Sequence, residues 1–236
     1  MEFSFTIGTN EYTVPKVVTV ELFQRAIAWD IEDKKNHKPF VSAMTDCPIH
    51  ELNILDDATF NVVLAVCVSR INFEDTELRH NIGGFRLLDF TTMTFGQFVD
   101  IDILIADGMT KHTVELVHKL YGIPEEAAAS KDVREVWKTL VAVAEFRQSV
   151  YMEHNEFFDI DNSHKDDDIE ISINNLQLMW YNAILVLAEG KFLNIQHVVE
   201  RPYKEALNFL TWKKSEMAKE QLKQLQKKND LQRRTR

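Results

Sequence analysis

Residues 90–121 read FTTMTFGQFVDIDILIADGMTKHTVELVHKLY, and this stretch decides the fold class of the chain. Thr94 and Gln97 form a T-x-x-Q capping box, in which each side chain bonds the backbone N–H of the other residue. Gly108 stands where a helix would end, because glycine adopts the left-handed conformation without a steric penalty. These signals predict a helix over residues 95–107.

A strand is the competing interpretation of the same residues. Apolar residues occupy every second position over residues 99–105, which is the period of a strand. On a strand, Asp100 and Asp102 would share a face as a carboxylate pair, whereas residues two apart on a helix diverge. We favour the helix because both ends carry capping signals and the span is long for a strand. The aspartates are then expected to be solvated or to pair locally. The expected buried face consists of Phe95, Phe98, Val99, Ile103 and Ala106.

A second helix is predicted directly after the first. Thr110 is its expected cap, the helix spans residues 111–121, and Gly122 followed by Pro124 ends it. Two helices joined by a short glycine-containing connection form a helical hairpin. The stretch therefore predicts helical rather than sheet architecture.

The rest of the chain extends this pattern. Alternating apolar residues around a Gly8 turn predict a β-hairpin over residues 3–14. Apolar residues at helical spacing, with Thr19, Asp56, Ser130 and Ser172 as expected caps, predict further helices. These helices cover residues 20–33, 57–71, 131–157 and 173–189, and a last one starts at Pro202. Residues 33–39 are expected to be a polar loop, residues 46–55 to be irregular or a short helical turn, and residues 124–130 to be a linker.

The predicted fold class is mainly α (α+β): a helical bundle with an N-terminal β-hairpin and a long C-terminal helix. We expect an N-terminal α+β domain over residues 1–123 and a C-terminal helical domain with a basic tail over residues 124–236. Seven glycines and five prolines in 236 residues are few for a turn-rich all-β fold. The 45% of hydrophobic residues suffices for a sizeable core.

The composition also points to a soluble intracellular protein. The N-terminus has no basic segment followed by an apolar one, and the longest apolar run, residues 62–68, is too short to cross a bilayer. Cys47 and Cys67 form no C-x-x-C pair. A disulfide between them is one alternative. We favour the other, in which both are buried free thiols in a reducing cytosol.

Charge is distributed unevenly along the chain. From Lys213 onward there are nine basic and three acidic residues, a net charge of +6, so residues 1–212 carry −16 of the total of −10. An acidic body argues against binding to nucleic acid. The tail lacks the interleaved aromatic residues of a nucleic-acid site and is too poor in large apolar residues for a membrane helix. It is expected to be a solvated helix end or to dock on an acidic partner.

Residues that could carry chemistry form no complete site. In residues 159–170, DIDNSHKDDDIE, five oxygen-bearing side chains fall at calcium-loop positions, but His164 stands where the sharp turn needs glycine. Cys47 and His50 lack a second pair of zinc ligands. The chain has no phosphate-binding glycine motif and no nucleophile elbow. We therefore predict a non-enzymatic protein with no cofactor and no metal.

Three longer stretches resemble one family. They are FTIGTNEYTVPKVVTVELFQRAIAWDIED at residues 5–33, TFGQFVDIDILIADG at residues 94–108, and LMWYNAILVLAEGKFLNIQHVVERPYKEALNFLTWKKSEMAKEQ at residues 178–221. Together they resemble the baseplate-hub and tail assembly proteins of T-even-type bacteriophages. The resemblance implies an assembly chaperone in the host cytoplasm that binds other proteins and has no catalytic residues. A permanent structural subunit of the virion is the alternative.

Such a function requires apolar surface for a partner. The candidate partner-binding residues lie beside the acidic segment and on the last helix: Phe157, Phe158, Tyr203, Leu207, Leu210, Trp212 and Met217. A helix that lays such a face into a groove is a common mode of recognition. Internal packing of these residues is the alternative. The expected partners are phage baseplate-hub or tail proteins, or a second copy of the chain, and neither nucleic acid nor a membrane.

Overall fold

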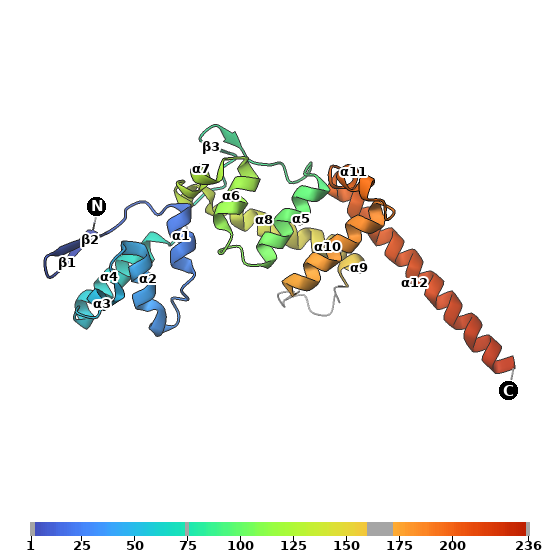
Figure 1. Cartoon of the computed structure of the whole chain (residues 1–236), viewed down its shortest axis with the longest axis horizontal. Helices are drawn as coiled ribbons and strands as arrows, with labels where there is room; N and C mark the ends of the chain where they lie inside the picture. Colours follow the sequence, from blue (N-terminus) through green and yellow to red (C-terminus); the bar gives the residue numbers. More distant parts are fainter. Residues whose placement is uncertain (1–2, 74–75, 160–171, 235–236) are drawn as a thin grey trace. The chain divides into compact units, whose positions relative to one another are not determined.

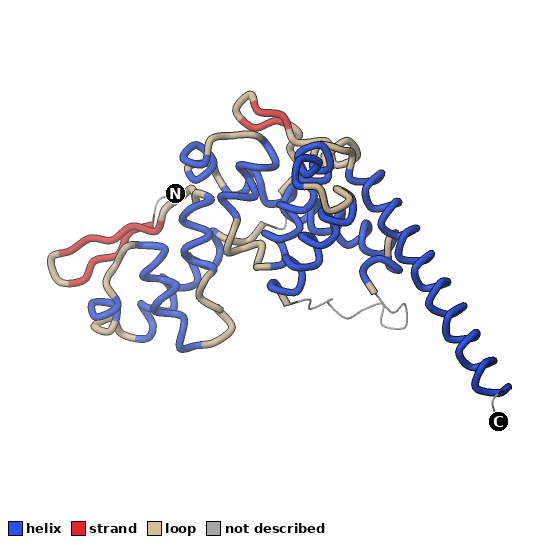
Figure 2. Tube along the Cα trace, turned by 45° about the vertical axis from the view of Figure 1, so that its right-hand side comes forward, coloured by secondary structure: helices blue, strands red, loops and turns tan. Residues whose placement is uncertain are grey.

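The computed structural model describes residues 3–73, 76–159 and 172–234, with side chains described as far as residue 227. Helices dominate these residues. Along this part of the chain there are twelve α-helices and two small antiparallel sheets of two strands each (Figures 1 and 2). The predicted class, mainly α with an N-terminal β-hairpin, is therefore confirmed.

The described residues divide into two compact units. Unit 1 contains the described residues up to Leu88 together with Leu104–Ala144, and unit 2 contains Asp89–Ile103 together with the described residues from Glu145 onward. The predicted domain boundary between residues 123 and 124 falls inside unit 1. The division into domains 1–123 and 124–236 stays a prediction.

Unit 1 begins with the predicted β-hairpin. Strands β1 (Phe3–Ile7) and β2 (Asn10–Val14) pair antiparallel, with Phe3 opposite Val14. Gly8 has a φ of 60°, a left-handed conformation that favours glycine in the connecting turn. Phe5, Ile7 and Val14 are buried, so one face of the hairpin packs on the unit.

The first helix is shorter than predicted. Thr19 caps α1 (Val20–Ile27) as expected, accepting a 3.2 Å hydrogen bond from the Leu22 amide. Asp33 then caps a 3-10 turn at Lys34–Asn36, and α2 (His37–Thr45) follows directly. The prediction of a polar loop over residues 33–39 was wrong, because residues 34–36 form the 3-10 turn and residues 37–39 begin α2. Pro39 lies in the first turn of α2, where its missing N–H costs no helical hydrogen bond.

The remaining elements of unit 1 are short, apart from one helix. They are α3 (Ile49–Leu52), α4 (Asp57–Arg70), β3 (Asn81–Ile82), β4 (Phe85–Arg86), α6 (Thr113–Tyr121) and α7 (Glu125–Ala129). Asp56 caps α4 as predicted, accepting from the Thr59 amide at 2.9 Å. Both cysteines are free and buried, as we favoured.

Two local predictions in unit 1 were wrong. Thr110 does not cap α6: the helix starts later, and His112 occupies the cap position without a side-chain bond. Instead the Thr110 carbonyl accepts from the Thr113 hydroxyl at 2.9 Å. The predicted linker at residues 124–130 contains α7. Pro124 can stand at the start of this helix, because the first backbone N–H groups of a helix make no helical hydrogen bond and the missing N–H of proline costs nothing there.

The central stretch is helical. Helix α5 (Phe95–Ala106) passes from unit 2 into unit 1. The capping box is complete: the Gln97 amide donates to Thr94 Oγ1 at 3.2 Å, and the Thr94 amide donates to Gln97 Oε1 at 2.9 Å. The strand interpretation is therefore wrong, and the helix prediction is confirmed.

The rest of unit 2 consists of helices. They are the C-terminal part of α8 (Val133–Glu153), α9 (Asn155–Phe158), α10 (Ile173–Leu187), a 3-10 turn at Phe192–Asn194, α11 (Ile195–Val199) and α12 (Tyr203–Arg234). The predicted helix over residues 131–157 breaks at His154 into α8 and α9. Neither predicted serine cap forms. The Ser130 hydroxyl donates to the Ala127 carbonyl instead, and the Ser172 side chain makes no capping hydrogen bond to α10.

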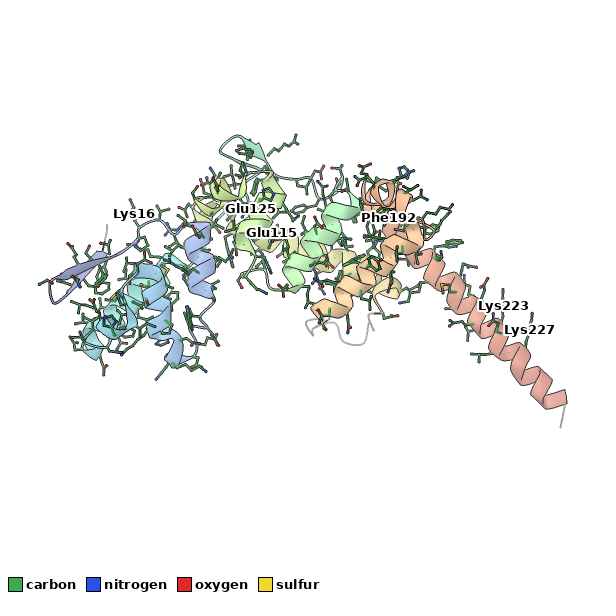
Figure 3. The ribbon with its side chains drawn as sticks, in the orientation of Figure 1. Lys16, Glu115, Glu125, Phe192, Lys223 and Lys227 are labelled. Carbon is green, nitrogen blue, oxygen red and sulfur yellow. The ribbon has the colours of Figure 1, made fainter. Side chains whose placement is uncertain are left out.

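Helix α12 extends beyond the body of unit 2. Every side chain from Met217 to Lys227 is exposed, so this part of the helix makes no core of its own. Lys223 and Lys227 project from it into solvent (Figure 3). Among the described residues, no helix is long and apolar enough to cross a bilayer.

Candidate functional site

A buried ionic cluster in unit 2 holds three helices together. Asp102 of α5 is 1% exposed. Its Oδ1 accepts from Arg147 Nε of α8 at 2.6 Å, and its Oδ2 accepts from Trp180 Nε1 of α10 at 2.7 Å. The Tyr151 hydroxyl of α8 donates to Oδ1 at 2.8 Å and lies 3.0 Å from Oδ2. The carboxylate thus receives donors from two helices other than its own.

This cluster was not predicted from the sequence. Asp102 was expected to be solvated or to pair locally, and that expectation was wrong because the partners lie 45 to 78 residues away. Burial raises the pKa of Tyr151 far above its ordinary value, and the negative charge of Asp102 raises it further. The phenol therefore stays protonated and donates its hydrogen bond to the carboxylate. With both oxygens engaged, the carboxylate acts as a structural acceptor that fixes α5, α8 and α10.

An apolar groove lies beside this cluster on unit 2. Its volume is about 320 Å³, near the lower end of the range for ligand pockets. Side chains from α9, α10 and α12 line it, and most of them are apolar. The lining consists of Phe157, Phe158, Asp159, Met179, Asn182, Ala183, Val186, Leu210, Lys213, Lys214 and Met217.

The aromatic end of the groove is held from both sides. Phe158 stacks on Tyr151 of the ionic cluster with ring centroids 3.9 Å apart. Lys214 of α12 donates from Nζ to the Phe157 carbonyl at 3.0 Å and pairs with Asp159 at 2.5 Å. Asp159 ends α9 with a φ of 56°. These contacts fix the short helix α9 against α12, and with it the two phenylalanines.

Four of the seven sequence-predicted partner-binding residues meet in this groove. Phe157, Phe158, Leu210 and Met217 line it, although they come from segments more than 50 residues apart. Met217 is 54% exposed, and Phe158 and Leu210 are nearly covered. The groove therefore has an apolar floor and a more open apolar rim.

The other three predicted residues lie elsewhere. Tyr203 and Leu207 are buried in the core of unit 2, and the Tyr203 ring stacks on Phe98 at 5.2 Å. Trp212 is 58% exposed, is not part of the groove lining, and contacts Phe209 at 5.6 Å between ring centroids. For Tyr203 and Leu207, the structure shows the internal packing that was the alternative interpretation.

Exposed apolar side chains outside the groove were also not predicted from the sequence. Phe192, which is labelled in Figure 3, and Leu193 lie in the turn between α10 and α11. Their exposed fractions are 82% and 91%. Leu178 and Tyr181 are more than half exposed on α10. Two adjacent apolar residues directly after Gly190 and Lys191 were the sequence signal for the first pair. Clusters of exposed apolar residues are typical of protein-binding surfaces.

In the described part of the chain, no group of three or more His, Cys, Asp or Glu side chains has an arrangement that could hold a metal ion. Of the calcium-like segment, Asp159 pairs with Lys214, and residues 160–170 lie outside the described residues. Burial raises the pKa of Cys47 to about 11, so the thiol beside His50 in the sequence is protonated rather than poised as a ligand.

Comparisons with protein-family models, with curated proteins and with solved structures found no match to this chain.

Proposed function

We propose that this chain is a non-enzymatic assembly factor of a phage baseplate hub or tail, which acts by binding other proteins. The observation that carries the protein-binding part is the groove between α9, α10 and α12, lined mainly by apolar side chains. The phage assignment rests on the resemblance of residues 5–33, 94–108 and 178–221 to T-even assembly proteins.

The physical argument concerns exposed apolar area. Burial of apolar surface is favourable by about 25 cal/mol per Å². Val186 and Met217 at the groove are 38% and 54% exposed, and they gain this free energy only if a partner covers them. Contiguous exposed apolar side chains in a folded protein usually mark a binding surface. We favour a protein partner over a small substrate, because the groove volume is near the lower end of the range for ligand pockets and the apolar side chains of Val186 and Met217 remain exposed at it.

A second candidate is a permanent structural subunit of the baseplate or tail. The observation that favours it is α12, in which all side chains from Met217 to Lys227 are exposed. A helix whose side chains are exposed along three turns is suited to a lasting interface. Obligate interfaces bury about 2,000 Å² or more, which α12 together with the groove would help to supply.

Deletion of the gene from the phage that encodes it tests the proposal. We expect infected cells to accumulate unassembled hub or tail proteins, and a plasmid copy of the gene to restore particles. Normal baseplates without the gene would contradict the proposal. Quantitative mass spectrometry of purified particles then separates the two candidates: a fixed copy number indicates a structural subunit, and loss from particles indicates a transient factor.

A further inference from the structure

The two helical walls of the groove differ in charge. Helix α10 reads INNLQLMWYNAILVL and contains no charged residue over its whole length. The opposite wall, α12, brings Lys213 and Lys214 to the groove. One wall is therefore neutral and the other is cationic, so an occupant meets charge on one side only.

Among the described lining residues, the one acidic side chain is already neutralised. Asp159 lies 2.5 Å from Lys214, which also donates to the Phe157 carbonyl. Lys213 forms no ion pair with any described residue, and its ammonium lies 5.9 Å from the centroid of the Phe209 ring. Lys214 and Asp159 cancel, so among the described residues that line the groove the remaining charge is that of Lys213.

The shape of the groove suits a helix. It lies between α10 and α12, and side chains at helical spacing line both walls: Met179, Ala183 and Val186 on one, Leu210, Lys213 and Met217 on the other. The space between two helices accepts the side-chain ridge of a third. An amphipathic helix fills such a groove through apolar anchors at positions i, i+3 or i+4, and i+7.

We propose that the groove binds an amphipathic helix of a partner protein whose apolar face is flanked by acidic residues. The apolar face covers Phe157, Val186 and Met217, and an acidic side chain pairs with Lys213. This inference rests on the proposed function and specifies the chemistry of the partner. A second copy of this chain fits less well, because its own exposed helix α12 is basic and would bring lysines to Lys213.

Fluorescence anisotropy of two labelled synthetic peptides, titrated with the full chain, tests this partner chemistry. Both are helical, about 18 residues long, with leucines along one face. One carries glutamates beside that face, and the other carries lysines at the same positions. We expect the acidic peptide to bind about tenfold or more tightly than the basic one, with a preference that weakens at high salt. Equal binding, preference for the basic peptide, or no binding of either would overturn the inference.

A matched pair of variants locates the binding on the groove. Lys213→Glu reverses a charge at the groove, and Lys223→Glu makes the same change further along α12. We expect the first to weaken binding of the acidic peptide about fivefold or more, and the second to leave it within about twofold. Equal effects would mean that the basic tail, not the groove, attracts the peptide, and would overturn the inference.

The outcomes separate this inference from the proposed function. If neither peptide binds while gene deletion still blocks hub assembly, the groove chemistry is wrong and the proposed function stands. If the peptide preference is found while gene deletion leaves assembly normal, the groove chemistry stands and the proposed function falls. Val186→Asp serves as a second groove variant: it places a carboxylate on the apolar wall, and we expect it to abolish binding of the acidic peptide.

Discussion

Removal of the Asp102 carboxylate should strongly destabilise unit 2. In the Asp102→Ala variant, Arg147, Tyr151 and Trp180 all lose their acceptor. The Arg147 side chain is only 15% exposed, so its charge would remain buried without a counter-charge. Breaking a buried ion pair in this way costs about 3–5 kcal/mol, a large share of the roughly 5–15 kcal/mol that stabilises a typical domain.

A double-mutant cycle with Arg147→Met isolates the ionic contribution. In the wild type, Arg147→Met should destabilise, because it leaves the carboxylate without its cation. In the Asp102→Ala background, the same change removes the unpaired cation and should raise stability. Urea unfolding followed by circular dichroism, with the slope of the transition compared between variants, measures both effects. A loss below about 1 kcal/mol for Asp102→Ala, or an equal cost of Arg147→Met in both backgrounds, would refute the reasoning.

Three further predictions concern single positions. Burial lowers the pKa of His154 below its ordinary value of 6.5, so the unfolded chain binds the proton more readily and stability should fall as the pH drops below 6.5. The His154→Gln variant should lose less stability between about pH 7.5 and pH 5.5, as measured by urea unfolding midpoints at the two pH values. An unchanged pH dependence would contradict this role of His154. Thr94→Ala should cost about 1 kcal/mol in the same assay by removing half of the capping box of α5, and no loss would contradict that role. Burial raises the pKa of Cys47 to about 11 and that of Cys67 to about 12, so both thiols should react with a disulfide reagent only when denaturant opens the protein. Rapid reaction in the native state would contradict their burial.

Local signals in the sequence predicted the helices that carry the fold. Thr94 with Gln97, Thr19 and Asp56 each place a side-chain acceptor next to the start of a helix, and all three make the expected bonds. Capping depends on residues within one turn, so it can be inferred from adjacent letters. The same reasoning failed at Ser130, where Asp132 accepts from the Arg134 amide instead and the helix starts two residues later.

Contacts between distant segments could not be predicted in the same way. Asp102 lies on an apolar helix, and nothing within one turn of it indicates Arg147 or Trp180 as a partner. The groove was predicted in part: aromatic and apolar residues on α9 and α12 were expected to bind a partner, but not the wall from α10. Tyr203 was placed with them because spacing alone does not distinguish the two faces of α12.

Complementation of the gene deletion by groove variants tests the central claim most directly, namely that the chain assembles phage structures through its groove. Val186→Asp alters the groove wall on α10, and Gln177→Asp places a carboxylate on the same helix at an exposed position outside the groove lining. Plaque formation is counted after confirming that both variants fold. We predict that Gln177→Asp restores plaques and that Val186→Asp does not. Full restoration by Val186→Asp would contradict the account.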